Sequence, residues 1–293
     1  MDRRFHTRER MDFFGVRPSK GLGQNFLNDF SVVQEIVYSA GLTKEDFVIE
    51  VGPGLGAMTG RLAESAGQVL AVEIDRSLIP PLQAVCMEHG NIELIEGDIL
   101  KLDIRSIAAE RIAASGGALK RVKVVANLPY YITTPIILSF LEHALPLLTS
   151  MTFMVQKEVA QRMTARPGGK EYGALTVAVG YFSEPELLFT VPPHCFLPQP
   201  AVDSAVVRLM VRKEPPFPLE DRDFFFKVVR ASFCQRRKML ANSLANAPYL
   251  GISREKAAAC IEALGREPGI RGEVLSPEEF GRLSNLILQN RGI

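Results

Sequence analysis

The sequence is poor in the residues that build metal sites and disulfide frameworks. Its four cysteines and four histidines are scattered over 293 residues. No Cys-x-x-Cys pair occurs, so neither a zinc site nor a disulfide framework is expected, and reduced thiols are the default. The histidines show no metal-ligand spacing either. We therefore expect a protein that binds no metal.

Long apolar runs are also missing. No stretch approaches the roughly 20 apolar residues that a membrane helix needs, and residues 1–6 lack the apolar core of a secretory signal. Three acidic residues near the N-terminus, Asp2, Glu9 and Asp12, argue against a mitochondrial presequence. These absences predict a cytoplasmic protein without a membrane partner.

The charge of the chain is small overall but unevenly placed. A net charge of +1 does not by itself predict a polyanionic partner. Residues 1–20 hold six basic residues against three acidic ones, and residues 213–293 hold 13 against 10, so the middle of the chain is net negative. This distribution favours ends that contact phosphate. Ordinary solvated surfaces are the alternative interpretation.

Predicted strands and helices alternate along the first half of the chain. Short, buried-looking apolar runs predict strands at residues 47–51, 68–74, 92–95, 122–126 and 151–155. Apolar residues at helical spacing predict helices at residues 28–40, 58–66, 78–89, 135–143 and 158–163. This alternation is typical of the α/β class and of a doubly wound, Rossmann-like parallel sheet. Residues 174–182 and 204–212 look like two further strands that pair antiparallel at the sheet edge.

A second, smaller domain is expected because the chain is longer than most single domains. Residues 214–218, Glu-Pro-Pro-Phe-Pro, interrupt any regular element and are the best candidate for a boundary. Beyond them the pattern predicts short helices, the last with Ser276 as its cap and Glu279 three residues later. We expect two domains: residues 1–213, which include a basic arm at 1–20, and an all-helical domain at residues 214–293.

A glycine-rich loop follows the first predicted strand of the sheet. Gly52, Gly54 and Gly56 lack β-carbons, so the backbone there can approach a ligand closely. Ligands of doubly wound sheets bind at the carboxyl ends of the strands, so we expect Gly52 and Gly54 to contact a cofactor. Gly52, Gly54 and Ala57 also fit the looser dinucleotide fingerprint, which leaves an NAD-dependent dehydrogenase as an alternative.

Acidic residues end the next two predicted strands. A carboxylate at Glu73 can accept hydrogen bonds from both hydroxyls of a ribose, and Asp98 could accept one from the amine of an adenine ring. Nicotinamide and S-adenosylmethionine cofactors both contain adenosine, so neither acid separates them. One such acid alone is more often a strand-end cap. Candidate contact residues that follow successive strands, in order along the chain, favour a ligand-binding site.

The sequence Asn-Leu-Pro-Tyr at residues 127–130 ends the fourth strand. The exocyclic nitrogen of adenine is a poor nucleophile because its lone pair is delocalised into the ring. The side-chain oxygen of Asn127 and a backbone carbonyl, that of Leu128, can each accept one of its N–H bonds and expose the lone pair to an electrophilic methyl group. Pro129 holds Leu128 extended, and Tyr130 offers a face for base stacking. The alternative is a proline-induced turn with a half-buried tyrosine.

Six motifs occur in order along the chain: Leu22–Leu27 (LGQNFL), Glu50–Gly54 (EVGPG), Glu73–Asp75 (EID), Gly97–Asp98, Asn127–Tyr130 (NLPY) and Phe196–Ser204 (FLPQPAVDS). Together they resemble the motifs of the ribosomal RNA adenine dimethyltransferases, and most closely the bacterial branch that acts on small-subunit (16S) RNA. The resemblance covers nearly the whole chain, from Ser19 to about Asn285.

This resemblance implies a class I methyltransferase domain that binds S-adenosylmethionine. It also implies that Phe196, with Tyr130, sandwiches the target adenine. The cofactor contacts of the family fall on Asn25, Leu27, Gly52, Glu73, Asp98 and Asn127.

The resemblance further implies a reaction and a partner. The product would be N6,N6-dimethyladenosine at two adjacent adenines in the 3′-terminal hairpin loop of 16S RNA. The partner would be the small (30S) ribosomal subunit, with a role in ribosome biogenesis for a protein that is monomeric when free. Two alternatives stay open: a 23S RNA dimethyltransferase of the macrolide-resistance type, and a mainly non-catalytic assembly factor.

Basic residues cluster in the predicted C-terminal domain. Lys227, Arg230, Arg237 and Lys238 fall within an arc of roughly 100° on a helix between residues 224 and 244. Arg236 would lie on the apolar side, so the helix is expected to break near Gln235. A basic stripe can follow an RNA backbone through charge, although a solvated helix face is common. The predicted RNA contacts are Lys227, Arg230, Arg236, Arg237 and Lys238.

Overall fold

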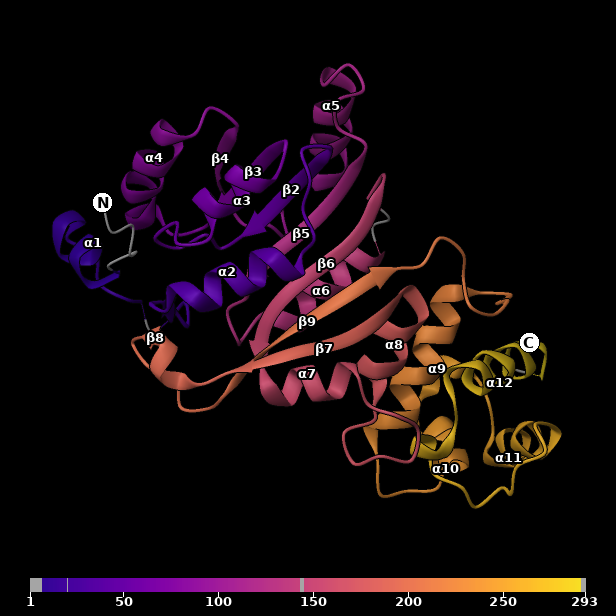
Figure 1. The fold of residues 1–293 in the computed structure, drawn as a ribbon. Coiled ribbons are helices and arrows are strands. Elements are labelled where there is room, and N and C mark those ends of the chain that lie inside the picture. The colour runs from indigo at the N-terminus through magenta and orange to yellow at the C-terminus, as the bar shows by residue number, and fades with distance from the viewer. Residues whose placement is uncertain (1–6, 20, 143–144, 291–293) are drawn as a thin grey trace. The chain divides into compact units, whose positions relative to one another are not determined.

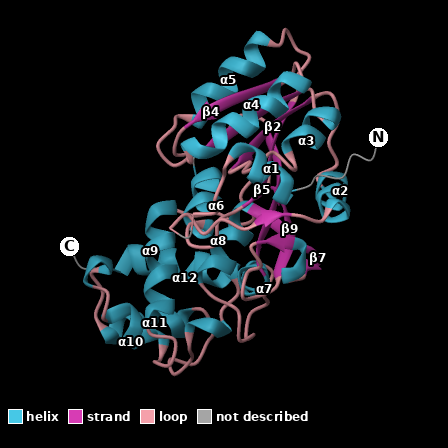
Figure 2. Cartoon of the chain, turned by 90° about the vertical axis from the view of Figure 1, so that its left-hand side faces the viewer, coloured by secondary structure: helices cyan, strands magenta, loops and turns pink. Residues whose placement is uncertain are grey.

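The computed structural model describes residues 7–19, 21–142 and 145–290. The chain divides into two compact units, and each unit is built from two stretches: Met1–Ala160 with Pro185–Val211, and Gln161–Glu184 with Arg212–Ile293. The elements of both units are labelled in Figure 1. Figure 2 shows the strands gathered in the first unit, whereas helices and loops make up the second.

A seven-stranded sheet forms the centre of the first unit, in the order β4-β3-β2-β5-β6-β9-β7. Strands β2 to β6 are parallel to one another, and β9 is antiparallel to β6. A separate antiparallel pair joins β1 to β8. The bounds are β1 Phe26–Leu27, β2 Asp46–Val51, β3 Gln68–Glu73, β4 Ile92–Glu96, β5 Arg121–Asn127, β6 Leu148–Gln156, β7 Ser183–Val191, β8 Phe196–Leu197 and β9 Ser204–Val211.

Helices α3 to α6 of the first unit connect the parallel strands. The order of the strands reverses between β2 and β5, and crossovers between parallel strands are right-handed. It follows that α3 and α4 cover one face of the sheet and α5 and α6 the other. The bounds are α1 Thr7–Phe14, α2 Phe30–Ser39, α3 Thr59–Ser65, α4 Ile79–Glu88, α5 Ile104–Ala114, α6 Thr133–Glu142 and α7 Lys157–Met163, of which α7 runs into the second unit.

The second unit is built mainly from helices around an aromatic core. The Tyr181 ring lies 5.4 Å from that of Phe217 and 5.5 Å from that of Phe225. Phe225 and Phe226 belong to the same cluster, at 5.0 Å from each other. The helices of this unit are α8 Ala174–Phe182, α9 Arg222–Cys234, α10 Leu240–Ala245, α11 Arg254–Ala263 and α12 Pro277–Asn290.

Most of the predicted elements are confirmed, including the strand that begins at Ser204, but this strand pairs antiparallel with β6 and not with residues 174–182. The helix over 28–40 is capped by Asp29, whose carboxylate accepts from the Ser31 N–H at 2.9 Å. Ser276 and Glu279 cap the last helix reciprocally, at 2.8 and 3.2 Å. The helix that contains the basic stripe ends at Cys234, so the break near Gln235 is also confirmed.

The strand predicted at residues 174–182 is wrong, because these residues form α8. A helix that is apolar on almost every side shows no helical period, and α8 buries Leu175, Val177 and Tyr181 among others. The same burial explains why the predicted domain boundary at residue 213 does not separate the two units completely. Residues 161–184 belong to the second unit, where Tyr181 packs on Phe217 and Phe225. Helices α1 and α5 were not predicted.

Within the described residues, no helix is both long enough and apolar enough to span a membrane. The same residues include no cluster of three or more histidine, cysteine or acidic side chains that could hold a metal ion.

Candidate active site

The carboxyl ends of β2, β3 and β5 open into one cavity in the first unit. This is the point where the strand order reverses, which is where doubly wound sheets bind ligands. The cavity is lined by all the predicted cofactor contacts and by the acceptor loop: Asn25, Leu27, Gly52, Gly54, Glu73, Asp98, Asn127, Leu128, Pro129 and Tyr130.

The glycine loop forms the floor of this cavity in a backbone conformation that side chains disfavour. Gly52 and Gly54 have φ angles of +64° and +63°. A β-carbon at Gly52 would meet no atom within 4 Å, so it would project into open space. At Gly54 it would lie 3.1 Å from the ring of Phe26. The loop therefore leaves room for a ligand to approach the backbone closely.

Glu73 holds this loop in place. Its carboxylate accepts hydrogen bonds from the Gly54 N–H at 3.1 Å and from the Asp75 N–H at 2.9 Å. The side chain is buried, and desolvation raises its pKa above the ordinary value despite the two N–H donors. An acid that is buried at the cavity wall is well placed to gain from the hydroxyl donors of a ribose.

Glu50 is a cavity residue that the sequence analysis did not assign to the site. It is fully buried in β2, and neither carboxylate oxygen has a hydrogen-bond partner among the described residues. Burial raises its pKa to about 8. A buried acid without a partner is costly, so a cationic group in the cavity would stabilise it strongly. The signal in the sequence was an acid inside the otherwise apolar run FVIEV.

The adenine end of the predicted cofactor site has apolar walls. Ile74 and Ile99 each follow one of the acids that end β3 and β4, and both line the cavity. Ile74 is 51% exposed, so its side chain is open to a ligand in the cavity. Asp98 accepts from the Leu100 N–H at 3.1 Å and lies 3.5 Å from the Lys101 amine. The sequence analysis identified the acid but missed both isoleucines.

The acceptor loop presents two oxygen atoms that are free to accept hydrogen bonds. The Asn127 side-chain N–H donates to the backbone oxygen of Asn25 at 3.3 Å, which leaves the Asn127 Oδ1 available. The Leu128 N–H donates to the oxygen of Met154 at 3.1 Å, and no described residue donates to the Leu128 carbonyl. By contrast, the Pro129 carbonyl accepts from Thr133 Oγ1 at 3.0 Å. Two fixed acceptors match the two N–H bonds of an amino group.

The aromatic ring of Tyr130 is anchored beside these acceptors. Its hydroxyl lies 2.7 Å from that of Ser204, the first residue of β9. Burial raises the pKa of Tyr130, so the phenol stays protonated. The neighbouring Tyr131 also lines the cavity but is 58% exposed.

Phe196 is not among the residues that line the cavity. It lies in β8, pairs with Leu27 of β1 and is only 2% exposed. Its ring belongs to a core cluster with Val33 and Val206. The structure therefore does not bring Phe196 and Tyr130 together around the cavity, and its stacking on a target adenine stays a prediction.

The described part of the basic arm is folded onto the first unit. The Thr7 hydroxyl donates to the Leu27 carbonyl at 2.8 Å, and the Arg10 guanidinium donates to that of Pro81 at 2.8 Å. Val16 packs in a cluster with Phe26 beside the glycine loop. Residues 1–6 and Lys20, which carry part of the expected positive charge, lie outside the described residues.

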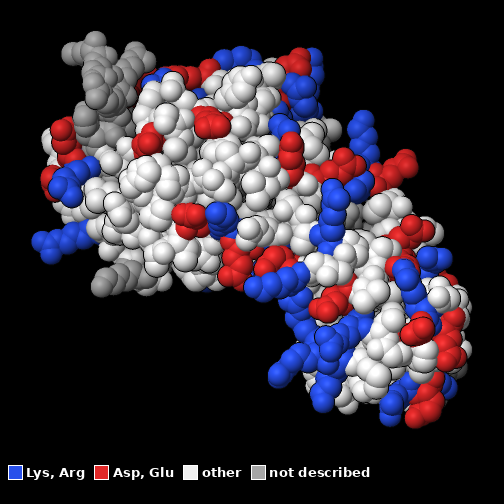
Figure 3. Space-filling view, turned by 60° about the horizontal axis from the view of Figure 1, so that its bottom comes forward, with Lys and Arg blue, Asp and Glu red and all other residues white. Residues whose placement is uncertain are grey.

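The predicted RNA contacts lie in the second unit, and all five are exposed. Figure 3 shows a group of Lys and Arg side chains gathered on part of this unit, in the lower right of the view. Lys227 and Arg230 lie on α9, whereas the other three lie in the turn that follows it. Arg236 differs from the rest because its guanidinium donates to the carbonyls of Lys170 and Tyr172.

Comparisons with known proteins agree with this site. Residues 17–261 match the family model described as "Ribosomal RNA adenine dimethylase". The ribosomal RNA small subunit methyltransferase A of Lachnoclostridium phytofermentans is 49% identical over 92% of this chain and 91% of its own length. The chain is likewise similar to many other proteins of that description, at 46–48% identity.

Solved structures extend the likeness to the fold. A dimethyladenosine transferase from Plasmodium falciparum superposes with a TM-score of 0.71 at 25% identity, over 88% of this chain and 95% of its own. The 23S rRNA methyltransferase ErmE gives 0.67 at 28% identity, over 90% and 100% of the two chains. The alternative of an NAD-dependent dehydrogenase is thereby wrong, and the cofactor is S-adenosylmethionine. The chain belongs to the ribosomal RNA adenine dimethylase family and is a methyltransferase.

Proposed function

We propose that the protein dimethylates the N6 amino groups of two adjacent adenines in the 3′-terminal hairpin loop of 16S RNA, within the small ribosomal subunit. The observation that carries the chemistry is the pair of free acceptors, Asn127 Oδ1 and the Leu128 carbonyl, at the wall of the cofactor cavity. The choice of subunit is supported by relatives named for the small subunit, at 46–49% identity, against 28% for the 23S enzyme.

S-adenosylmethionine supplies an electrophilic methyl group on a sulfonium. Asn127 and Leu128 accept the two N–H bonds of the adenine amine and direct its lone pair toward that methyl carbon. Bound in the cavity, the cofactor would supply the methyl carbon to which this lone pair forms the N–C bond, and the electrons of the C–S bond would stay on sulfur. The proton then leaves the alkylated nitrogen to water, so no strong general base is required. Tyr130 stacks on the base, which is worth about 1–3 kcal/mol.

The remaining cavity residues would hold the cofactor. Glu50 would accept the ammonium of its methionine part, since this buried acid lacks any described partner. Glu73 would accept from the ribose hydroxyls and Asp98 from the adenine amine. The glycine loop offers the open backbone that the methionine part needs.

The target adenine must leave its stack to reach Asn127. An unpaired hairpin loop lowers the cost of this step, which fits a substrate in a loop rather than in a duplex. The reaction would take place in the cytoplasm, with the free protein as a monomer that joins a maturing subunit and contributes to ribosome biogenesis. Sedimentation of the free protein would test its oligomeric state.

The test uses methyl-labelled S-adenosylmethionine with unmethylated small subunits, large subunits and free 16S RNA, each in a separate reaction. The expected product is dimethyladenosine in small-subunit RNA only, and its loss in Asn127→Ala. Label in large-subunit RNA would move the activity to 23S RNA. Tight binding of small subunits without any label would favour the assembly factor.

A further inference from the structure

Two segments of the second unit that lie far apart in the sequence are joined by one side chain. Arg236, in the turn after α9, donates from Nη2 to the carbonyl of Lys170 at 2.7 Å and to that of Tyr172 at 3.0 Å. The same nitrogen lies 3.5 Å from the Glu273 carboxylate. The Gly168 N–H donates to the Glu273 carbonyl at 2.7 Å. Hydrogen bonds at Gly168, Lys170 and Tyr172 therefore hold the loop at residues 164–172 in place.

This arrangement places exposed cations from both segments on one surface. The loop contributes Arg166 and Lys170, and the turn at residues 235–239 contributes Arg237 and Lys238. None of these four side chains forms an ion pair with a described residue. The loop itself carries one acid, Glu171, and the nearby Glu273 faces Arg236. We call these four side chains the composite basic surface.

The chemistry of the composite basic surface suits a phosphate backbone. It offers four flexible cations, and the aromatic ring of the loop, that of Tyr172, is fully buried with its hydroxyl on the Leu275 carbonyl. Base recognition in single strands relies on aromatic stacking, whereas structured RNA is bound largely through its phosphates and its shape. The loop at residues 164–172 was not identified as an RNA contact from the sequence.

We propose that the composite basic surface binds the phosphate backbone of structured RNA in the small subunit, with Arg166 and Lys170 as contacts. We also propose that Arg236 is a positioning residue for this loop. This inference rests on the proposed function. The Nη2 of Arg236 donates to two carbonyls and faces a carboxylate, so Arg236 holds the loop in place through a planar geometry that lysine cannot reproduce.

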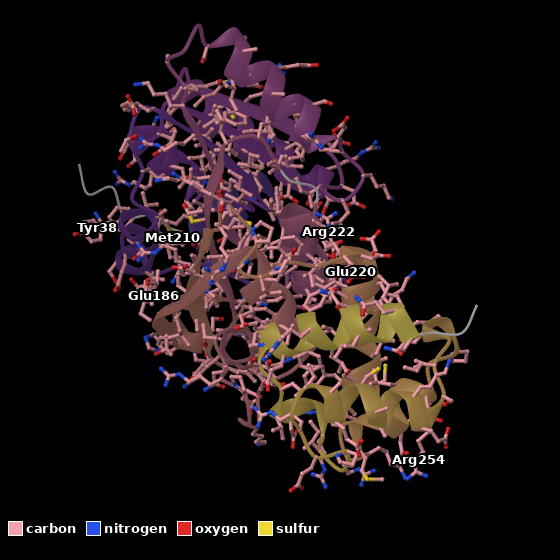
Figure 4. The ribbon with its side chains drawn as sticks, turned by 90° about the vertical axis from the view of Figure 1, so that its right-hand side faces the viewer. Tyr38, Glu186, Met210, Glu220, Arg222 and Arg254 are labelled. Carbon is pink, nitrogen blue, oxygen red and sulfur yellow. The ribbon has the colours of Figure 1, made fainter. Side chains whose placement is uncertain are left out.

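The first test measures binding of unmethylated small subunits at several salt concentrations. Arg166→Ala combined with Lys170→Ala should weaken binding. The slope of log K against log salt should become shallower by about 1.4–1.8, as expected for two lost phosphate contacts. The matched control removes two other exposed arginines, Arg222 at the start of α9 and Arg254 at the start of α11 (Figure 4), and should bind as the wild type does.

The second test separates positioning from contact. Arg236→Lys keeps the charge, but its side chain is one bond shorter, so it should lose affinity much as the double loop variant does. Adding Arg236→Lys to that double variant should cause little further loss, because both changes remove the same contacts. The KM for subunits should rise in both cases while kcat is kept, since the catalytic cavity lies in the other unit.

Several outcomes would overturn the inference. A loop variant with wild-type affinity would remove Arg166 and Lys170 from the interface, and weaker binding at an unchanged salt slope would indicate a protein contact instead of phosphate. Wild-type binding by Arg236→Lys would make Arg236 a simple charge contact. In each case the proposed function still holds if the wild-type protein methylates small subunits. If the wild-type protein neither binds nor methylates small subunits, the proposed function itself is refuted.

Discussion

The hydroxyl groups of Tyr130 and Ser204 lie 2.7 Å apart and join the acceptor loop to the start of β9. Ser204 is fully buried, and its backbone pairs with Gln156 of β6. Tyr130 is therefore fixed by a strand that is itself fixed by the sheet. The end of the FLPQPAVDS motif thus reaches the catalytic loop through Ser204, although its first residue, Phe196, lies in the core.

Ser204→Ala should lower methyl transfer because the Tyr130 ring loses its anchor. A net hydrogen-bond contribution of about 0.5–1.5 kcal/mol corresponds to a loss of roughly 2- to 13-fold in kcat/KM for small subunits. Tyr130→Phe should behave similarly, and the double variant should lose little more than either single one. Tyr38→Phe, at a tyrosine of α2 that is 86% exposed and does not line the cavity, is the control and should remain fully active. Additive losses in the double variant would show that the two hydroxyls act independently.

Asn127→Ala should reduce kcat far more than it changes subunit binding. Loss of one preorganised hydrogen bond to developing charge typically costs roughly 10²–10³ in kcat. Asn127→Asp keeps an acceptor oxygen but loses the N–H that donates to Asn25, so it should retain more activity than the alanine variant. Single-turnover methylation with pre-bound subunits measures this step. Equal activities for the two variants would exclude the side-chain oxygen as the acceptor.

The site was largely predictable from the sequence because the carboxyl ends of parallel strands meet at one edge of a sheet. Gly52, Glu73, Asp98 and Asn127 each follow or end a strand, and a correct strand order brings them together. Glu50 lines the same cavity, but it lies within strand β2 and not after its end. Within a strand, the sequence alone does not show toward which side an acidic side chain points.

Other features depended on contacts that no local pattern encodes. The apolar run of α8 fits a buried strand as well as a buried helix, and only its partners Phe217 and Phe225 decide between them. Arg236 looked like one more cation in a basic stripe. Its hydrogen bonds to Lys170 and Tyr172 join residues more than sixty positions apart. Phe196 could not be oriented, since an aromatic between prolines suits a rigid loop or a core.

Gly52→Ala should weaken cofactor binding beyond its effect on stability. Both Gly52 and Gly41 have positive φ angles, +64° and +57°, and neither would place a β-carbon within 4 Å of another atom. Alanine at either position should cost about 1–2 kcal/mol of unfolding free energy, measured with urea. Only the methyl group added at Gly52 would enter the cofactor cavity. Calorimetry should therefore show that Gly52→Ala binds S-adenosylmethionine about tenfold or more weakly than the wild type. Gly41→Ala should bind it with unchanged affinity. Equal affinities would place the cofactor away from this loop.

Glu50 should make the cofactor-free protein less stable as pH rises. Its pKa is raised to about 8 in the folded chain, against 4.5 for an unperturbed glutamate. Between these values the folded state binds more protons than the unfolded state, so the free energy of unfolding falls with increasing pH. Glu50→Gln removes this titration. The Tm of Glu50→Gln minus the Tm of the wild type should therefore increase from pH 5 to pH 8.

An exposed acid supplies the control for this pH dependence. Glu158→Gln removes a carboxylate from the surface of α7 and should track the wild type across the same range. S-adenosylmethionine should raise the Tm of the wild type more than that of Glu50→Gln, because its ammonium stabilises the ionised form of Glu50. Parallel Tm curves for wild type and Glu50→Gln, with equal shifts on adding cofactor, would mean that Glu50 does not titrate in this window and does not bind the ammonium.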